Sequence, residues 1–395
     1  MQQVASPPQK QPFAFLALYA LASAGGAVAY VPFLTLLLPL QIQRIASGAE
    51  IDVLAYATFG GAIAASLANI GFGWASDVTK NRRPWIAAGL ILSSMLLIAL
   101  REAASVWHLL LMLAAWQLAL NMMLAPLAAW AGDCFPDEQK GLLGGMLAFA
   151  PALGALAGVL VTMQDIAPQS RNLLIAGLVT FMVLPALIAG RGRVRPALVG
   201  DGDISAPAKA GRAAVGRMWL ARLLVQIAEA ALFAYALFWL FGLDDAVRER
   251  DVARLFGLAM AIAVPLALIA GRWSDRTDRP ILPLCIAAGI ACAGLVAMAV
   301  MEGLSAATAS YLVFGIAGAV FLSLHSAQTL RVLPHAATRG RDLGVFNLTN
   351  TMPSLVMPWI AILVVPQYGF SGLFWLLAVL TGIAALLLFT LLRRT

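Results

Sequence analysis

The sequence has few charged residues and few side chains that carry catalytic chemistry. Only 11% of its 395 residues are Asp, Glu, Lys or Arg, and it has three histidines and three cysteines. It contains no His-Glu-x-x-His zinc motif, no phosphate-binding Gly-Lys-Ser/Thr and no cysteine cluster. These absences argue against a metalloenzyme, a nucleotide-driven pump and a disulfide-stabilised domain. We therefore expect neither enzymatic activity nor a cofactor.

Apolar residues, in contrast, make up 62% of the chain, and the mean hydropathy is +0.88. A soluble domain of this length does not have this composition, so the solvent must be lipid. Because lipid satisfies no backbone polar group, each apolar segment must be a helix. We predict an all-α membrane protein with 12 transmembrane helices of about the length that a bilayer requires. They lie at about 13–40, 52–75, 84–101, 105–131, 140–162, 171–190, 217–242, 252–273, 280–302, 306–332, 343–365 and 370–391.

The positions of the lysines and arginines predict the orientation. Nineteen of the 26 fall on the side that holds both chain ends, six fall on the other side, and Arg222 lies within a span. By the positive-inside rule both termini are cytoplasmic, and we expect an integral protein of a bacterial cytoplasmic (inner) membrane. The net charge of +7 therefore reflects topology and does not require a nucleic-acid partner.

The remaining polar segments predict the domain organisation. Residues 1–12 are expected to be disordered, and 191–216 is the only long polar connector, which we interpret as a flexible cytoplasmic linker. This linker separates an N-terminal six-helix half, 13–190, from a C-terminal six-helix half, 217–391. Residues 392–395 form a short cytoplasmic tail.

A polar hairpin that occurs twice indicates that the two halves are related. The stretch from Gly73 to Pro84 returns as Gly271 to Pro280, so that Asp275 follows Asp77 by 198 residues. A second loop, with Pro136 in the first half, returns at Pro334 with the same offset. The common offset predicts two pseudo-symmetric halves, and internal duplication is typical of secondary transporters.

The Gly-x-x-x-Asp hairpin between spans 2 and 3, repeated between spans 8 and 9, resembles the signature loop of the major facilitator superfamily. The Pro-x-x-x-Lys/Arg-Gly loop after spans 4 and 10 is also similar to that family. Lys80 and Asn81 stand where the family has Gly-Arg. The resemblance implies the family fold and a gate in which Asp77 faces the start of span 11. The implied gating residues are Asp77, Arg82, Arg83, Asp275, Arg276, Arg279 and Arg339.

One acid lies at membrane depth. Of nineteen acidic residues eighteen lie in loops or at span ends, and only Glu229 falls in the middle of a span, about twelve residues after position 217. An ionisable group there is costly unless it is paired, protonated or facing water. Arg222 and Gln226 precede Glu229 at helical spacing and share one face with it. We interpret this face as a site for substrate or protons, with interhelical packing as the alternative.

Further polar residues lie in spans 1, 4, 7 and 10, which line the central cavity in the family that the chain resembles. Each alone is as often an interhelical hydrogen-bonding residue, so their joint placement is the informative observation. Asn347 and Asn350 in span 11 add to them, either in packing or in a gate. The candidate substrate-binding residues are Tyr19, Ser23, Tyr30, Gln117, Asn121, Gln226, Glu229, Ser323, Gln328, Asn347 and Asn350.

Three residues are candidates for proton coupling. Glu229 is the first, because a carboxyl that gains and loses a proton can couple transport to a proton gradient. Arg222 could pair with the ionised carboxylate. His325 is the third, since histidine titrates near neutrality; the alternative is a neutral histidine that donates to a backbone carbonyl.

These observations favour a secondary active transporter that acts as a monomer. It would move a small polar or amphipathic solute by alternating access, as a proton-coupled symporter. The segment from Arg339 to Pro353 resembles that before span 11 of sucrose-type sugar transporters. One alternative is an efflux antiporter for drugs or lipophilic metabolites, although span 4 lacks an arginine and Ala150–Gly154 is only a fragment of the expected signature. Another is a membrane assembly factor or receptor that does not transport.

Overall fold

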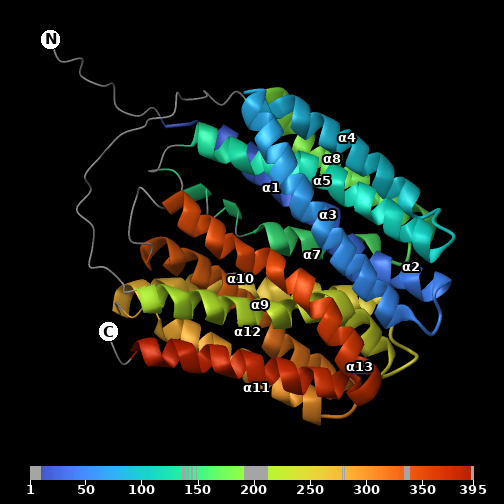
Figure 1. Ribbon diagram of the computed structural model, residues 1–395, viewed down its shortest axis with the longest axis vertical. Helices are drawn as coiled ribbons and strands as arrows, with labels where there is room; N and C mark the ends of the chain where they lie inside the picture. The colour runs from blue at the N-terminus through green and yellow to red at the C-terminus, as the bar shows by residue number, and fades with distance from the viewer. Residues whose placement is uncertain are drawn as a thin grey trace. The chain divides into compact units, whose positions relative to one another are not determined.

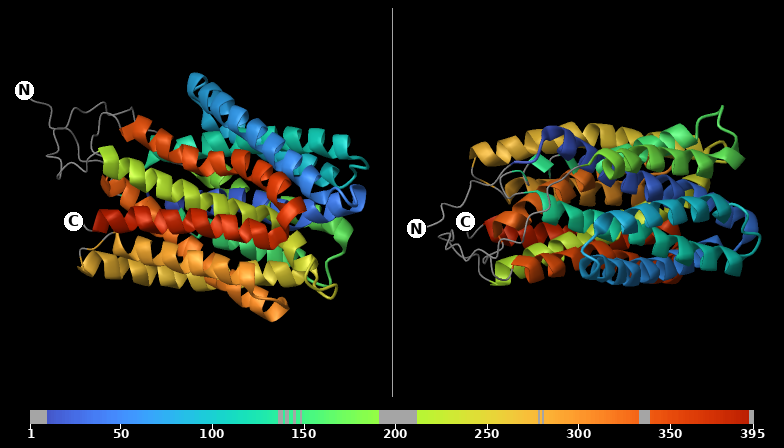
Figure 2. Two further views of the ribbon diagram at one scale, coloured as in Figure 1. Left: turned by 60° about the horizontal axis from the view of Figure 1, so that its bottom comes forward. Right: turned by 90° about the horizontal axis from the view of Figure 1, so that it is seen from above.

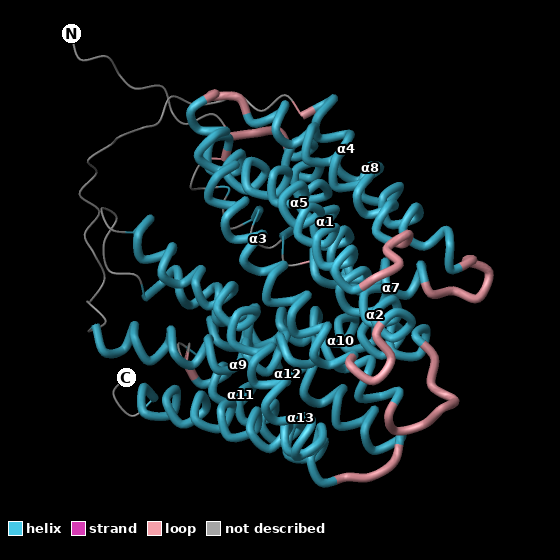
Figure 3. Tube along the Cα trace, turned by 45° about the vertical axis from the view of Figure 1, so that its right-hand side comes forward, coloured by secondary structure: helices cyan, strands magenta, loops and turns pink. Residues whose placement is uncertain are grey.

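In the residues that it describes, the computed structural model consists of helices joined by turns and loops, without a strand, as Figure 3 shows. These residues are 10–135, 139, 142–143, 146–147, 149–190, 212–277, 279, 281–332 and 339–392. Of these, 212–213, 275, 326–332, 339–348 and 351 are described by their backbone alone.

The described elements follow the chain in a single series of helices (Figure 1). Pro32 has no N–H donor for the helical ladder, and a π-helical turn follows it directly. The elements are α1 (Phe13–Pro32), the π-helix η1 (Phe33–Leu37), α2 (Leu38–Ile45), α3 (Glu50–Val78), α4 (Arg82–Leu100), α5 (Val106–Cys134), α7 (Ala150–Val161), the 3-10 helix η2 (Pro168–Ser170), α8 (Arg171–Ala189), α9 (Arg212–Phe241), α10 (Glu249–Thr277), α11 (Leu282–Val300), α12 (Leu304–Val332) and α13 (Arg339–Leu392).

Ten described helices, counting α1, η1 and α2 as one, are long and apolar enough to cross a membrane. The shorter apolar helix α7 covers the second part of the predicted span 140–162. The last two predicted spans both lie in α13, which is divided at Gly369, where φ is 64°. All twelve predicted spans thus contain described helix, and the prediction of an all-helical membrane protein is confirmed.

The chain forms two compact units, and the first comprises residues 1–32, 64–157 and 164–202. In it α4 packs on α5 and α8, and α1 packs on α8 and α5. The contact between α4 and α5 is close because Gly89 has no side chain. A Cβ there would lie 2.8 Å from the Met122 carbonyl carbon.

The second unit comprises residues 33–63, 158–163 and 203–395. In it α9 and α11 pack on α13, and α12 packs on α11 and α10; the same neighbours can be followed in Figures 1 and 2. Gly294 allows α11 to approach α12, since a Cβ there would lie 2.7 Å from the Phe314 nitrogen. The π-helix η1 and α2 pack on α9 within this unit, so it takes in residues from near the start of the chain.

Candidate functional site

The first copy of the duplicated hairpin is organised by Arg82, the first residue of α4. Its Nη2 lies 2.5 Å from Asp77 Oδ1 at the end of α3, and its Nε donates to Asp133 Oδ2 on α5 at 2.9 Å. Its Nη1 donates to the buried Ser76 hydroxyl at 2.6 Å. One guanidinium therefore ties the ends of three helices together. Asp77, the predicted gating acid, is held within its own unit by this network.

The turn of this hairpin has a left-handed residue. Lys80, at the position where the resembling family has glycine, adopts φ 52°. Asn81, the next residue, is extended with φ −141° and precedes α4. The left-handed turn therefore forms without glycine, at a steric cost of roughly 1–2 kcal/mol for an L-residue.

The two copies of the hairpin differ in chemistry. Ser76 and its counterpart Ser274 are both buried, but the Ser274 hydroxyl has no hydrogen-bond partner in the described part of the chain. The residue 198 positions after Arg82 is Pro280, so the second copy has no arginine at the position from which Arg82 reaches Ser76. Arg276 and Arg279 are exposed. The side chain of Asp275, a predicted gating residue, lies outside the described residues, as does that of Arg339.

Glu229 lies in the middle of α9 and faces α12. Its Oε1 is buried, and no hydrogen bond or ion pair joins it to any other residue that the structure describes. The carboxyl lies against Gly318 of α12: a Cβ at Gly318 would be 2.9 Å from Glu229 Cδ and 3.7 Å from Cγ. Tyr311, seven residues earlier on α12, interacts electrostatically with the carboxylate. The Oε1 atom of Glu229 thus lies in a helix interface, while the residue as a whole is half-buried.

Arg222 and Gln226, which precede Glu229 on α9, face α13 instead. Arg222 Nε donates to Gln226 Oε1 at 3.2 Å and to Thr349 Oγ1 at 3.0 Å. Asn350 Oδ1 accepts from Arg222 Nη2 at 3.2 Å and from Gln226 Nε2 at 2.8 Å. The structure therefore brings together three predicted residues, Arg222, Gln226 and Asn350. It adds Thr349, which the sequence did not single out, and it separates Glu229 from this network.

His325 is fully buried between α12 and α9. Its Nε2 lies 2.9 Å from the carbonyl oxygen of Met218, and its ring packs on Phe321 with centroids 5.4 Å apart. A carbonyl oxygen can only accept, so Nε2 carries a proton. This contact is the backbone donation that the alternative expects, and either protonation state of the ring can make it.

Candidates in the first unit link helices. The Tyr19 hydroxyl donates to the Leu127 carbonyl at 2.9 Å, and its ring packs edge-on against Trp130. Asn121 donates to the Gln117 carbonyl at 2.9 Å and accepts from Asn69 at 3.3 Å, which joins α5 to α3.

The other predicted residues are placed singly. Arg83 lies with its guanidinium carbon 5.4 Å from the centroid of the Trp130 ring, at cation–π distance. Ser23 and Tyr30 are half-buried, and Ser323 is exposed. The side chains of Gln328 and Asn347 lie outside the described residues.

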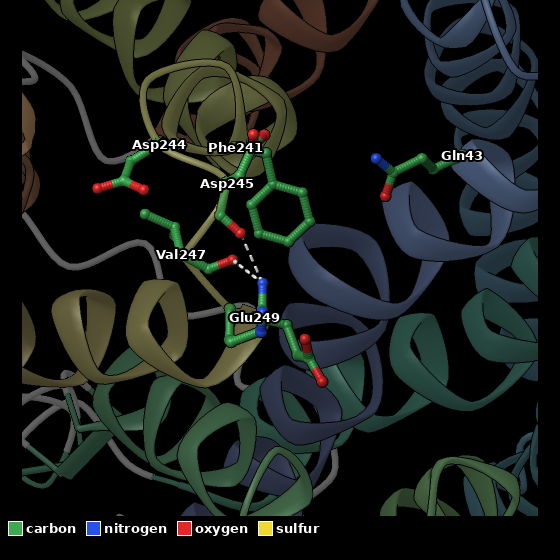
Figure 4. A pocket seen from close by; sticks show the side chains of 7 residues that line it. Gln43, Phe241, Asp244, Asp245, Val247 and Glu249 are labelled. Carbon is green, nitrogen blue, oxygen red and sulfur yellow. Dashed lines mark hydrogen bonds between the residues drawn. The ribbon is translucent and has the colours of Figure 1, made fainter.

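A pocket of about 330 Å³ lies in the second unit where α9 and α10 are joined (Figure 4). Arg248 in its wall donates to the carbonyl oxygens of Asp245 at 2.7 Å and of Val247 at 3.3 Å. These bonds order the loop itself, and the lining includes none of the predicted site residues. The lining residues are Gln43, Phe241, Asp244, Asp245, Val247, Arg248 and Glu249.

Two solved structures are similar to this chain in fold. Both are crystal structures of a bacterial homologue of the human lysosomal transporter Spinster, in inward-facing conformations, one occupied and one unoccupied. The occupied form has a TM-score of 0.71 and 16% identity over 97% of each chain. The unoccupied form has a TM-score of 0.68 and 15% identity over 96% of each chain. At these identities the likeness shows the fold alone.

Sequence comparison identifies the family directly. No curated protein sequence matches the chain. The model of the Major Facilitator Superfamily matches residues 13–337 and again residues 255–395, which together cover nearly all of it. This agrees with the duplicated hairpin, the apolar helices and the likeness to the two transporter structures. The chain belongs to the major facilitator superfamily, and it is therefore a membrane transporter and not an enzyme.

Proposed function

We propose that this transporter couples the movement of a small polar or amphipathic solute to protons, by alternating access. The observation that carries the proposal is Glu229, whose Oε1 is buried in a helix interface without a hydrogen bond in the described part of the chain. An ionised carboxylate in such a place costs several kcal/mol, so the carboxyl is held there with its proton. To release that proton the carboxyl must reach water or a cation, which requires a different arrangement of the helices.

The network of Arg222, Gln226 and Asn350 is the proposed solute contact. A guanidinium and two amides, joined by donor–acceptor distances of 2.8–3.2 Å, gather several hydrogen-bonding groups inside a hydrophobic span. Such groups bind the hydroxyl, carbonyl or anionic oxygens of a polar solute. Arg222 is one of the cations that a released Glu229 could pair with, because it lies two turns away on the same helix.

The proposal places the chain in a bacterial cytoplasmic membrane as a monomer, with both termini inside. Its six-helix halves would be 13–190 and 217–391, joined by a linker at 191–216. A sucrose-type sugar symporter is the narrower version of the proposal, and the segment from Arg339 to Pro353 is what supports it.

The substrate class is the first measurement. Thermal shifts of the detergent-solubilised protein with sugars, peptides, organic acids and amphiphiles identify a ligand, which is then used in proteoliposomes. Accumulation driven by an imposed proton gradient supports a symporter, and extrusion driven by it supports efflux. A protein that moves no ligand in either direction would favour the assembly factor or receptor.

Substitution of Glu229 tests the coupling. Glu229→Gln keeps the shape of the side chain but fixes it in a neutral state. Accumulation against a gradient should be abolished, while counterflow exchange, which needs no net proton movement, should survive. Glu102→Gln, in an exposed loop, is the matched control and should transport normally. If Glu229→Gln accumulates solute with the wild-type dependence on pH, the assignment of the proton site is wrong.

A further inference from the structure

Gly318 of α12 occupies an unusual position relative to Glu229. Both glycines in this part of α12, Gly315 and Gly318, are buried, but only Gly318 faces the carboxyl. The three nearest atoms to a Cβ at Gly318 all belong to the Glu229 side chain. Oε1 would be much closer to that Cβ than 3.0 Å, a separation below which Cβ atoms in proteins essentially never have a neighbour. The space that a side chain would fill at this position is therefore taken by the carboxyl group.

This arrangement also explains how the carboxyl remains without a hydrogen bond. A helix presents no backbone donor sideways, since its N–H groups bond along the axis. On the side where Oε1 lies against the Cα of Gly318, the carboxyl therefore meets no backbone donor. The titratable group that faces the carboxyl from α12 is Tyr311. On α9 itself, Gln226 lies about one turn from Glu229 and Arg222 about two turns from it.

We propose that Gly318 is the positioning residue for the coupling carboxyl, and that the absent side chain creates a dry seat in which Glu229 holds its proton. This inference rests on the proposed function only in calling the carboxyl a coupling group. When α9 and α12 shift relative to each other, Glu229 leaves the seat and can reach Gln226, Arg222 or water. The seat therefore separates a proton-holding position from a proton-releasing one.

Gly318→Ala tests the seat directly. The methyl group displaces only the end of a flexible side chain, because the atoms that it meets are Glu229 Oε1 and Cδ, so the variant should fold. Displaced from the seat, the carboxyl finds hydrogen-bond partners. Gly315→Ala is the matched control one turn away, where a Cβ would make ordinary contacts of 3.5 Å with Ala259 and Tyr311.

The readout is the infrared carbonyl band of the protonated Glu229 carboxyl, measured at acidic pH and identified by its absence in Glu229→Gln. A carbonyl without a hydrogen bond absorbs at higher frequency than one that accepts a bond. We expect the high-frequency band in the wild type and in Gly315→Ala, and a shift to lower frequency in Gly318→Ala. Accumulation of solute should fall at least tenfold in Gly318→Ala, while counterflow exchange is retained.

A compensating variant separates displacement of the carboxyl from damage to α12. The Glu229 Cγ would lie 3.7 Å from a Cβ at position 318, so the shorter carboxyl of Glu229→Asp leaves room for the methyl group. The double variant Glu229→Asp with Gly318→Ala should therefore recover the high-frequency band.

Several outcomes would contradict the proposal that Gly318 positions the Glu229 carboxyl. They are an unchanged band in Gly318→Ala, an equal shift in Gly315→Ala, failure of the double variant to recover the band, or no band that depends on Glu229. The proposed function fails separately. If Gly318→Ala shifts the band but Glu229→Gln still accumulates solute, the seat stands and the carboxyl does not couple protons.

Discussion

Arg82 and Asp77 form the shortest ion pair of the hairpin, with 2.5 Å between Nη2 and Oδ1, and the same guanidinium also holds Asp133 at 2.9 Å. Arg82→Ala would leave two carboxylates near each other without a shared cation. Asp77 is largely exposed, so solvent already weakens its share of the interaction. We expect a loss of about 1–2 kcal/mol, below the upper range for buried charged hydrogen bonds.

The measurement is thermal unfolding in detergent. Arg82→Lys should recover only part of the loss, because an ammonium cannot bind two carboxylates with a planar fork. Arg276→Ala, an exposed arginine of the second hairpin, is the control and should unfold as the wild type does. Equal stabilities of Arg82→Ala and Arg276→Ala would contradict the bridging role.

Lys80 offers a stabilising substitution. Its φ of 52° is costly for any residue with a side chain, so Lys80→Gly should raise stability by about 0.5–1 kcal/mol. Asn81→Gly is the matched control in the next residue, where φ is −141° and glycine only adds freedom to the unfolded chain. The two variants should therefore change the unfolding temperature in opposite directions. A fall in stability for Lys80→Gly would show that the lysine side chain compensates for its strain.

Close helix packing at Gly89 and Gly294 predicts two sensitive positions. In each case the added Cβ would meet backbone atoms of the neighbouring helix at less than 3.0 Å, and backbone cannot move aside cheaply. We expect Gly89→Ala and Gly294→Ala to lower stability by about 2 kcal/mol or more, as overpacking of a core does. Gly177→Ala and Gly289→Ala, where nothing lies within 4 Å, serve as controls on thermal unfolding. Four variants of equal stability would refute this packing.

The contact between His325 and Met218 predicts a structural role for the histidine. His325→Leu removes a buried hydrogen bond, so stability should fall by about 1–2 kcal/mol. We expect the dependence of transport on pH to stay as in the wild type, because a histidine that only holds this backbone contact would not need to exchange its proton. Transport by folded His325→Leu protein, measured across a range of pH, checks this. A changed pH profile would make His325 the proton relay.

The orientation can be tested with single cysteines in a background without the three native ones. Asn81→Cys and Asp245→Cys lie at exposed positions of turns that the arginine and lysine distribution places on opposite sides. An impermeant thiol reagent applied outside intact cells should label position 245 and not position 81. Labelling of position 81 alone would invert the proposed topology.

The fold could be predicted from the sequence because lipid imposes few solutions. Apolar segments of about 20 residues must be helices, and the hairpin repeated 198 residues apart indicates the duplication. Details that depend on backbone strain were less accessible. Lys80 adopts a left-handed conformation that its residue type disfavours, whereas the break at Gly369 falls between the predicted spans 343–365 and 370–391.

Only part of the candidate site could be predicted from the sequence. Helical spacing placed Arg222 and Gln226 on one face, and the structure confirms that they touch. The same spacing did not reveal that Glu229 faces α12 while Arg222 faces α13. That depends on how α9 is rotated against neighbours that come about 90 and 127 residues later in the sequence. The only local signal for Gly318 was a pair of glycines in an apolar helix.

The second compact unit has a consequence for biosynthesis, because it combines Phe33–Ile63 with residues from 203 onward. At about 5–20 residues per second, the ribosome needs on the order of 10 s to make the chain between them. During that interval η1 and α2 are in the membrane before α9, on which they finally pack, has been made. Their surfaces must therefore be compatible with lipid first and with protein later. A mutation between Phe33 and Ile45 therefore affects the nascent chain in the membrane before it affects the finished transporter.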